Sequence, residues 1–147
     1  MKFHIVSDSS CDLGRTELEQ LGVSMVSFYA AFEDEVYLRE ERDIPTHTFY
    51  QMMADRPGKF PKTSMPTMDD YLEAFRPLAA QGLPILCICL NAAFSGSYQS
   101  ALNAAAELKE ELPGTRVQAP DSTLATVPQG TLVQEAAALR AAGRTLD

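Results

Sequence analysis

The chain has 147 residues, of which 46% are hydrophobic and 22% charged, and these proportions exclude a disordered segment and favour one folded domain. Its formal net charge is −8, from 20 acidic and 12 basic residues. Since nucleic acids and membrane surfaces are anionic, this charge and the lack of a basic cluster argue against both as partners. The longest apolar stretch, 83–94, is too short and too interrupted to insert stably in a membrane.

The first half of the chain predicts alternating strands and helices. Apolar runs over 3–8 and 23–30 predict two strands, and 15–22 between them predicts a short helix. Residues 32–44 have mixed polarity and predict a short strand or a hairpin, and 45–55 predict a helix. The chain therefore begins with a strand–helix–strand unit.

The second half continues the same alternation. Residues 59–67 predict a loop fixed by two prolines, followed by a helix over 68–81 that Thr67 and Asp70 can cap. The continuous apolar run 84–90 predicts a strand covered on both faces.

Two helices and one strand complete the pattern. Residues 96–112 predict a long helix, 116–122 a last strand and 128–143 a last helix. Strands that alternate with helices are typical of βαβ units. The sequence therefore predicts an α/β fold with a mainly parallel sheet and helices on both faces, a three-layer α/β/α arrangement.

Small polar residues follow the predicted strands or precede a predicted helix. They are Asp8, Ser9 and Ser10, Thr63 and Ser64, Ser95, Gly96 and Ser97, and Asp121 and Ser122. Because ligands of parallel sheets bind beyond the carboxyl ends of the strands, we expect these loops to converge on one edge. Hydroxyls and unpaired N–H groups at a helix start bind anions, so the sequence favours an anion site. Each residue taken alone is more often a helix cap or a turn than part of a binding site.

Other chemistry has less support. Ser9 beside Asp8 suggests a serine hydrolase, but the G-x-S-x-G motif is absent, and neither His4 nor His47 is placed as a general base. Cys87 and Cys89 share one face of a predicted strand and are expected to be buried apolar residues, with no metal. No cofactor motif is found. Asp8 also interrupts any secretory signal, and we expect a reducing cytoplasm.

Four segments, "VSDSSCDL", "KTSMPT", "FSGSYQSA" and "APDST", in this order resemble the motif series of the DegV family of bacterial fatty-acid-binding proteins. The resemblance implies an α/β first domain followed by a smaller second domain, with a long-chain fatty acid between them. It implies that Thr63 and Ser95 hold the carboxylate, with Ser64, Gly96 and Ser97 beside them. It also implies presentation of the fatty acid to a fatty acid kinase, with no catalysis by the binding protein itself.

The sequence departs from the family pattern in several places, including Ser97 where the family commonly has Thr and the segment "LATVPQG" after Ser122. Asn91, Ala92 and Ala93 stand where the family commonly has serines. The chain stops at Asp147, about where the second domain is expected to begin, so we expect 1–147 to form the N-terminal domain alone. The main hypothesis is a non-enzymatic, cytoplasmic fatty-acid-binding domain. The alternatives are an esterase-like hydrolase that uses Ser9 or Ser95 and a lipid-free structural or oligomerising fragment.

Overall fold

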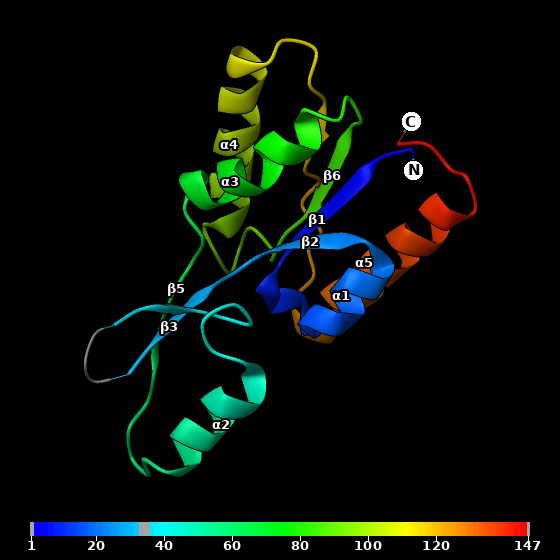
Figure 1. Ribbon diagram of the computed structural model, residues 1–147. Helices are drawn as coiled ribbons and strands as arrows, with labels where there is room; N and C mark the ends of the chain where they lie inside the picture. The colour runs from blue at the N-terminus through cyan, green and yellow to red at the C-terminus, as the bar shows by residue number, and fades with distance from the viewer. Residues whose placement is uncertain (1, 33–35, 147) are drawn as a thin grey trace.

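A computed structural model describes residues 2–32 and 36–146, and its centre is a four-stranded parallel sheet (Figure 1). The strands are short apolar segments separated along the chain by helices. In spatial order they are β2 (Val23–Val26), β1 (His4–Asp8), β6 (Ile85–Ile88) and β7 (Val117–Gln118). Every neighbouring pair runs parallel, as the alternation of strands and helices predicted.

Helices cover both faces of this sheet. One face carries α3 (Met68–Ala79) and α4 (Ser97–Glu111), and the other carries α1 (Arg15–Leu21) and α5 (Thr126–Ala141). The predicted fold class, a mainly parallel sheet between two helical layers, is therefore confirmed.

Strand β1 shows how the sequence builds two cores from one sheet. All five of its residues are buried, and successive side chains point to opposite faces. Val6 joins the apolar cluster under α3 and α4, whereas Ile5 joins the cluster under α1 and α5. A strand covered on both faces reads as an apolar run, and this is why β1 and β6 were recognisable.

A second, antiparallel sheet was not predicted. It consists of β4 (Leu38–Arg39), β3 (Tyr29–Ala31) and β5 (Lys62–Ser64), with α2 (Thr46–Ala54) connecting β4 to β5. Of the short strand or hairpin expected within 32–44, the short strand is present as β4, which pairs with β3 outside that range; 33–35 lie outside the described residues. The loop expected over 59–67 is wrong in its middle part, because β5 over 62–64 pairs with β3.

The single strand expected over 23–30 is also wrong, because the chain passes from one sheet to the other at Ser27 and Phe28. The Ser27 hydroxyl donates to the Glu40 carbonyl at 2.7 Å, and the Phe28 N–H donates to Ser9 Oγ at 2.9 Å. These contacts hold the chain in place where it changes sheets. We call residues 27–32 and 36–64 the lobe, and residues 2–26 and 65–146 the body.

Candidate functional site

The loops that follow β1, β6 and β7 meet at the carboxyl edge of the parallel sheet. The Asn91 N–H donates to the Leu124 carbonyl at 2.9 Å, and the Ser122 hydroxyl donates to the Cys89 carbonyl at 2.9 Å. Asp121 Oδ1 accepts the Ala92 N–H at 3.4 Å. Asp121 and Ser122 therefore shape the loop after β6, as expected for a shared edge.

Asp8, at the end of β1, lies beneath this edge and is completely buried. Its carboxylate accepts hydrogen bonds from five groups: Ser10 Oγ at 2.6 Å, Gln129 Nε2 at 2.8 Å, Ser97 Oγ at 2.8 Å, Leu90 N at 3.0 Å and Tyr71 Oη at 3.3 Å. Buried carboxylates are stable only when paired or hydrogen-bonded in this way. Asp8 thus joins the starts of α4 and α5 to the end of β6.

Ser97 and Tyr71 belong to the same buried network. Ser97 is fully buried, and its Oγ lies 2.7 Å from the Tyr71 hydroxyl. Burial, reinforced by the nearby Cys89 and Asp8, raises the pKa of Tyr71, so its hydroxyl keeps its proton and acts as a donor. In this structure the Ser97 side chain therefore points into the core.

Ser9 and Ser10 form the 3-10 turn η1 (Ser9–Cys11) directly after β1. The Ser9 hydroxyl donates to Glu40 Oε2 at 2.6 Å and accepts the Phe28 N–H, so it connects the body to the lobe. The Ser10 hydroxyl bonds to Asp8. Within the described residues, no histidine is hydrogen-bonded to Ser9 or Ser95.

Ser95 and Gly96 lie at the start of α4. Ser95 is half-buried, and its Oγ accepts the Ser97 N–H at 3.1 Å. Gly96 is exposed and immediately precedes the first helical residue. The first N–H groups of a helix lack intrahelical partners and carry a partial positive charge, so this turn favours an anion.

Thr63 and Ser64 lie on β5 in the lobe, and both are exposed. Met65 connects them to Gly96: a Cβ built on Gly96 would lie 2.7 Å from Met65 Sδ. Only glycine therefore allows this approach without displacing Met65. The two motifs, "KTSMPT" and "FSGSYQSA", are consequently in contact although about thirty residues separate them in the sequence.

The predicted site residues fall into three groups. Thr63 and Ser64 lie on β5 in the lobe, and Ser9 connects the lobe to the body. Ser95, Gly96, Asp121 and Ser122 lie at the carboxyl edge, and Met65 joins the Thr63–Ser64 strand to them. Asp8, Ser10 and Ser97 lie beneath the edge and hold it together. Sequence reasoning missed Tyr71 and Gln129, because a polar group buried in a helix leaves no periodic signal.

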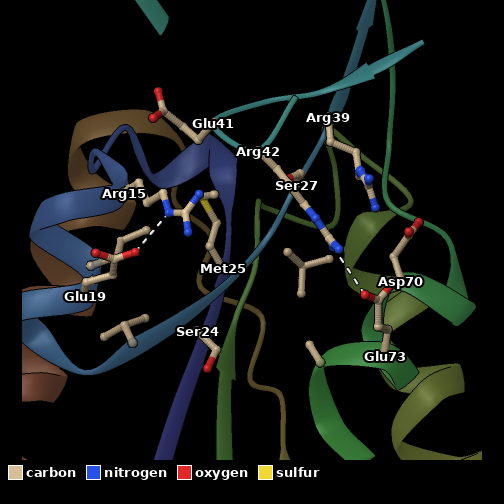
Figure 2. A pocket seen from close by; sticks show the side chains of 14 residues that line it. Arg15, Glu19, Ser24, Met25, Ser27, Arg39, Glu41, Arg42, Asp70 and Glu73 are labelled. Carbon is tan, nitrogen blue, oxygen red and sulfur yellow. Dashed lines mark hydrogen bonds and ion pairs between the residues drawn. The ribbon is translucent and has the colours of Figure 1, made fainter. Parts of the chain in front are cut away.

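A cavity of about 520 Å³ lies elsewhere, beside the open edge of β2 and between α1 and α3 (Figure 2). Four of its charged side chains are paired with each other: Arg15 with Glu19 at 2.9 Å and Arg42 with Glu73 at 3.2 Å. None of the predicted site residues lines it. The cavity is thus separate from the candidate anion site.

Neither a metal site nor a membrane span is found in the part of the chain that the structure describes. No three His, Cys, Asp or Glu side chains there are grouped to hold a metal ion. No helix among those residues has the length and apolar character to cross a bilayer.

The chain matches a known protein family over nearly its whole length. The model of the DegV family matches residues 2–147. A DegV domain-containing protein of Halalkalibacterium halodurans is 35% identical over 139 residues, which are 94% of this chain and 47% of that protein. The chain thus spans about half the length of the curated relatives it matches.

Solved structures agree with the sequence matches. A stearic-acid-binding protein of Eubacterium ventriosum has a TM-score of 0.92 and 38% identity, covering 98% of this chain and 49% of that one. A DegV family protein of Thermus thermophilus, described by its fatty acid binding, has a TM-score of 0.81 and 30% identity, covering 99% and 50%. The structures most relevant to this fold therefore include proteins that bind fatty acids.

Proposed function

Because the chain belongs to the DegV family, we propose that it binds a long-chain fatty acid without catalysing a reaction on it. In this proposal Thr63 and Ser95 hydrogen-bond the carboxylate, and Ser64 and Gly96 lie beside them. Residues 1–147 correspond to the family's N-terminal domain. The protein is cytoplasmic, and it presents its fatty acid to a fatty acid kinase.

One observation carries the proposal: Met65 of the Thr63 motif lies against Gly96 of the Ser95 motif. Among the described residues, neither the Thr63 hydroxyl nor the Ser95 hydroxyl donates a hydrogen bond to the protein. Both donors are therefore available to a carboxylate placed between β5 and the start of α4. Hydrogen bonds to a charged acceptor are stronger than neutral ones, so two hydroxyls suffice to orient the head group.

The acyl chain is expected to supply most of the affinity. About fourteen methylenes at roughly 0.8 kcal/mol each give about 11 kcal/mol when fully buried, against about 1.5–3 kcal/mol for a hydrogen bond to a charged group. Exposed apolar side chains stand near the proposed head-group position: Phe94 is 74% exposed and Met65 43% exposed. These side chains offer a surface for the first part of the chain.

The global charge of −8 is consistent with this division of roles. An acidic protein holds an anion through local dipoles and hydroxyls rather than through net charge. Ionic attraction therefore contributes little, and the acid is selected by its combination of a small anionic head and a long apolar tail.

Native mass spectrometry of the purified chain, followed by lipid extraction, tests the proposal. We expect co-purified fatty acid in the wild type and a large loss of it in Ser95→Ala and Thr63→Val. Ser24→Ala is the matched control, because Ser24 lines the separate cavity beside β2. Unchanged lipid content in Ser95→Ala contradicts the site, and a lipid-free wild type leaves only the structural alternative. Turnover of an ester by the wild type supports the hydrolase instead.

A further inference from the structure

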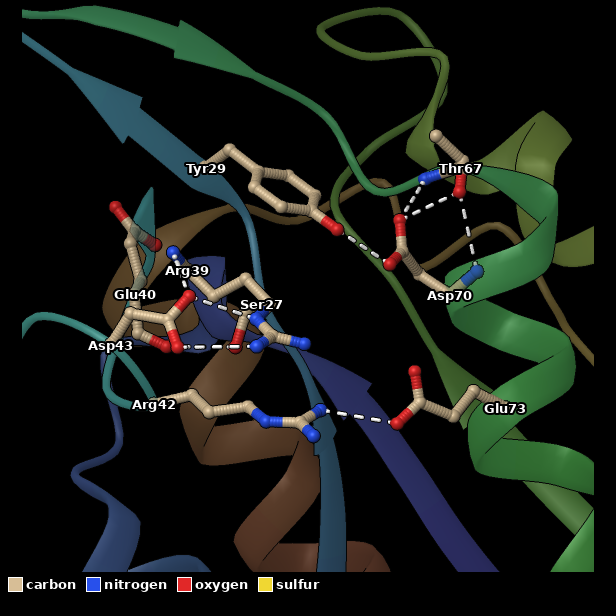
Figure 3. A network of polar contacts seen from close by, with 9 residues as sticks. All are labelled: Ser27, Tyr29, Arg39, Glu40, Arg42, Asp43, Thr67, Asp70 and Glu73. Carbon is tan, nitrogen blue, oxygen red and sulfur yellow. Dashed lines mark hydrogen bonds and ion pairs between the residues drawn. The ribbon is translucent and has the colours of Figure 1, made fainter. Parts of the chain in front are cut away.

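We infer that Tyr29 is a positioning residue for the carboxylate site: its hydrogen bond to Asp70 fixes Thr63 of the lobe relative to Ser95 of the body. The inference rests on the proposed function. Its basis is a set of polar contacts at the junction of the lobe and the body (Figure 3).

Tyr29 lies on β3, directly beside the strand that carries Thr63. In the antiparallel β3–β5 pair, Tyr29 is opposite Ser64 and Ala30 is opposite Thr63. Paired strands move together because their backbones are hydrogen-bonded. Any contact that fixes Tyr29 to the body therefore also fixes Thr63.

Asp70, in the first turn of α3, is the contact on the body. Its Oδ1 accepts the Tyr29 hydroxyl at 2.6 Å, and its Oδ2 accepts both the N–H and the hydroxyl of Thr67 at 2.7 Å (Figure 3). The Thr67 hydroxyl also accepts the Asp70 N–H at 3.2 Å, which completes a capping box. One carboxylate thus holds the lobe through one oxygen and the start of α3 through the other.

The segment between these two fixed points is Met65 and Pro66. Ser64 is held through the pairing of β5 with β3, and Thr67 is held by Asp70. Met65 lies against Gly96, beside Ser95. The Tyr29–Asp70 bond therefore closes a short loop of contacts that sets the separation of the two proposed carboxylate donors.

The protonation of the pair suits this role. Burial and the hydrogen bond to Asp70 raise the pKa of Tyr29 to about 12, so the hydroxyl is a donor at neutral pH. Burial disfavours the ionised form of Asp70, but the hydrogen bonds from Tyr29 and Thr67 outweigh it and lower the pKa of Asp70. The bond is thus charge-assisted, and the Tyr29 proton is already used within the protein. Tyr29 consequently influences the carboxylate site through the pairing of β3 with β5.

The role predicts a change in selectivity. Misplacing Thr63 relative to Ser95 weakens the hydrogen bonds to a carboxylate, whereas it leaves the contacts of the acyl chain in place. The discrimination between a fatty acid and the corresponding fatty alcohol should therefore fall. A merely structural loosening would reduce the binding of both ligands.

The experiment uses the 147-residue chain and measures dissociation constants for hexadecanoic acid and for hexadecan-1-ol. For Tyr29→Phe we expect acid binding to weaken by about tenfold and alcohol binding to stay within about twofold. Asp70→Asn, which loses the charge, should act in the same direction. Tyr50→Phe is the matched control, since it removes a hydroxyl from a 62% exposed tyrosine of the same lobe.

The possible results distinguish a failure of the inference from a failure of the proposed function. A wild type that binds the acid in preference to the alcohol, with Tyr29→Phe unchanged, overturns the role of Tyr29 and leaves the proposed function standing. Equal losses for both ligands in Tyr29→Phe also overturn it. A wild type that binds neither ligand, or does not prefer the acid, overturns the proposed function and this inference with it.

Discussion

In the body, β1 is buried at all five positions between two apolar clusters, whereas in the lobe α2 has no buried residue and β5 is exposed along its length. The lobe has a small apolar centre, in which the Phe32 and Phe49 rings lie 5.7 Å apart. Its contacts with the body include polar ones: Ser9 with Glu40, Tyr29 with Asp70 and Arg42 with Glu73.

This difference explains how the proposed site is divided. In the proposed site, the body supplies Ser95 just before α4, and the lobe supplies Thr63 on an exposed strand. Regions with few buried apolar contacts open at a lower free energy than the core does. If Thr63 and Ser95 are the carboxylate donors, we expect the polar contacts at the junction to determine how well the two are aligned.

The largest effect is expected for a cavity in the body. Phe75→Ala removes a completely buried ring that packs with Tyr71 at 5.8 Å between centroids, and the free energy of unfolding should fall by about 3–5 kcal/mol. Phe60→Ala is the comparison in the lobe, where the ring is 88% exposed, and a change within about 0.5 kcal/mol is expected. Urea unfolding followed by circular dichroism measures both. Similar losses in the two variants would contradict the contrast between body and lobe.

A smaller, local effect is expected at the junction. Ser9→Ala removes a donor to Glu40 and leaves the Phe28 N–H without its partner, so the junction should weaken by about 1–2 kcal/mol. We expect faster amide hydrogen exchange in β3 and β4, with β1 and β6 unchanged. Thr131→Ala, in which a hydroxyl bonded to Val127 within α5 is removed, is the control. Faster exchange throughout the body would show that the two regions unfold together.

The body was predictable because its signals are local. The apolar runs that became β1 and β6 and the capping pair of Thr67 and Asp70 depend on neighbouring residues, and the structure has them as predicted. In the lobe, α2 was predicted and is present, but β3 and β5 were not predicted, since each is three residues long and they pair across the whole of α2. Nothing within 23–30 signals that the chain changes sheets at Ser27.

The sequence indicated the small polar residues of the candidate site but not which of them are buried. Small polar residues were expected in the loops after the strands, and in the structure the loops that carry Ser95 and Asp121 are hydrogen-bonded to each other. The sequence did not reveal that Asp8 and Ser97 lie beneath the edge, because burial depends on which side chains cover a loop. Tyr71 and Gln129, which cover them, come from two different helices.

We expect a pH dependence of the free energy of unfolding that arises from His4 in the body. His4 on β1 is 7% exposed, and its Nε2 is buried without a hydrogen-bond partner among the described residues. Burial, together with the charge of Arg140, lowers the pKa of His4 from 6.5. The unfolded chain therefore binds this proton more readily than the folded one. The contribution of His4 to the free energy of unfolding is fully present above about pH 6.5. It decreases as the pH falls below this value, by at most about 1.4 kcal/mol per pH unit.

Urea unfolding between pH 5 and pH 7.5 measures this effect, and His4→Gln should flatten the lower part of the profile. His47→Gln, at an exposed position in the lobe, should leave the profile as it is in the wild type. If His47→Gln flattens the profile and His4→Gln does not, then the acid-sensitive contacts lie in the lobe and the assignment to β1 is wrong.

The smallest effect is expected for the ion pair between Arg42 and Glu73. The two side chains are 53% and 63% exposed, and water competes for both, so Arg42→Met should change the free energy of unfolding by at most about 0.5 kcal/mol. Salt should remove even this difference in the free energy of unfolding.

The affinity of Arg42→Met for the fatty acid should also stay unchanged, in contrast to that of Tyr29→Phe. The reason is that Arg42 follows β4, whereas Tyr29 pairs with the strand of Thr63. Urea unfolding at low and high salt, with the fatty acid dissociation constant, tests this. If Arg42→Met weakens acid binding as much as Tyr29→Phe does, then the attachment of the lobe as a whole, and not the hydroxyl beside β5, aligns the two donors.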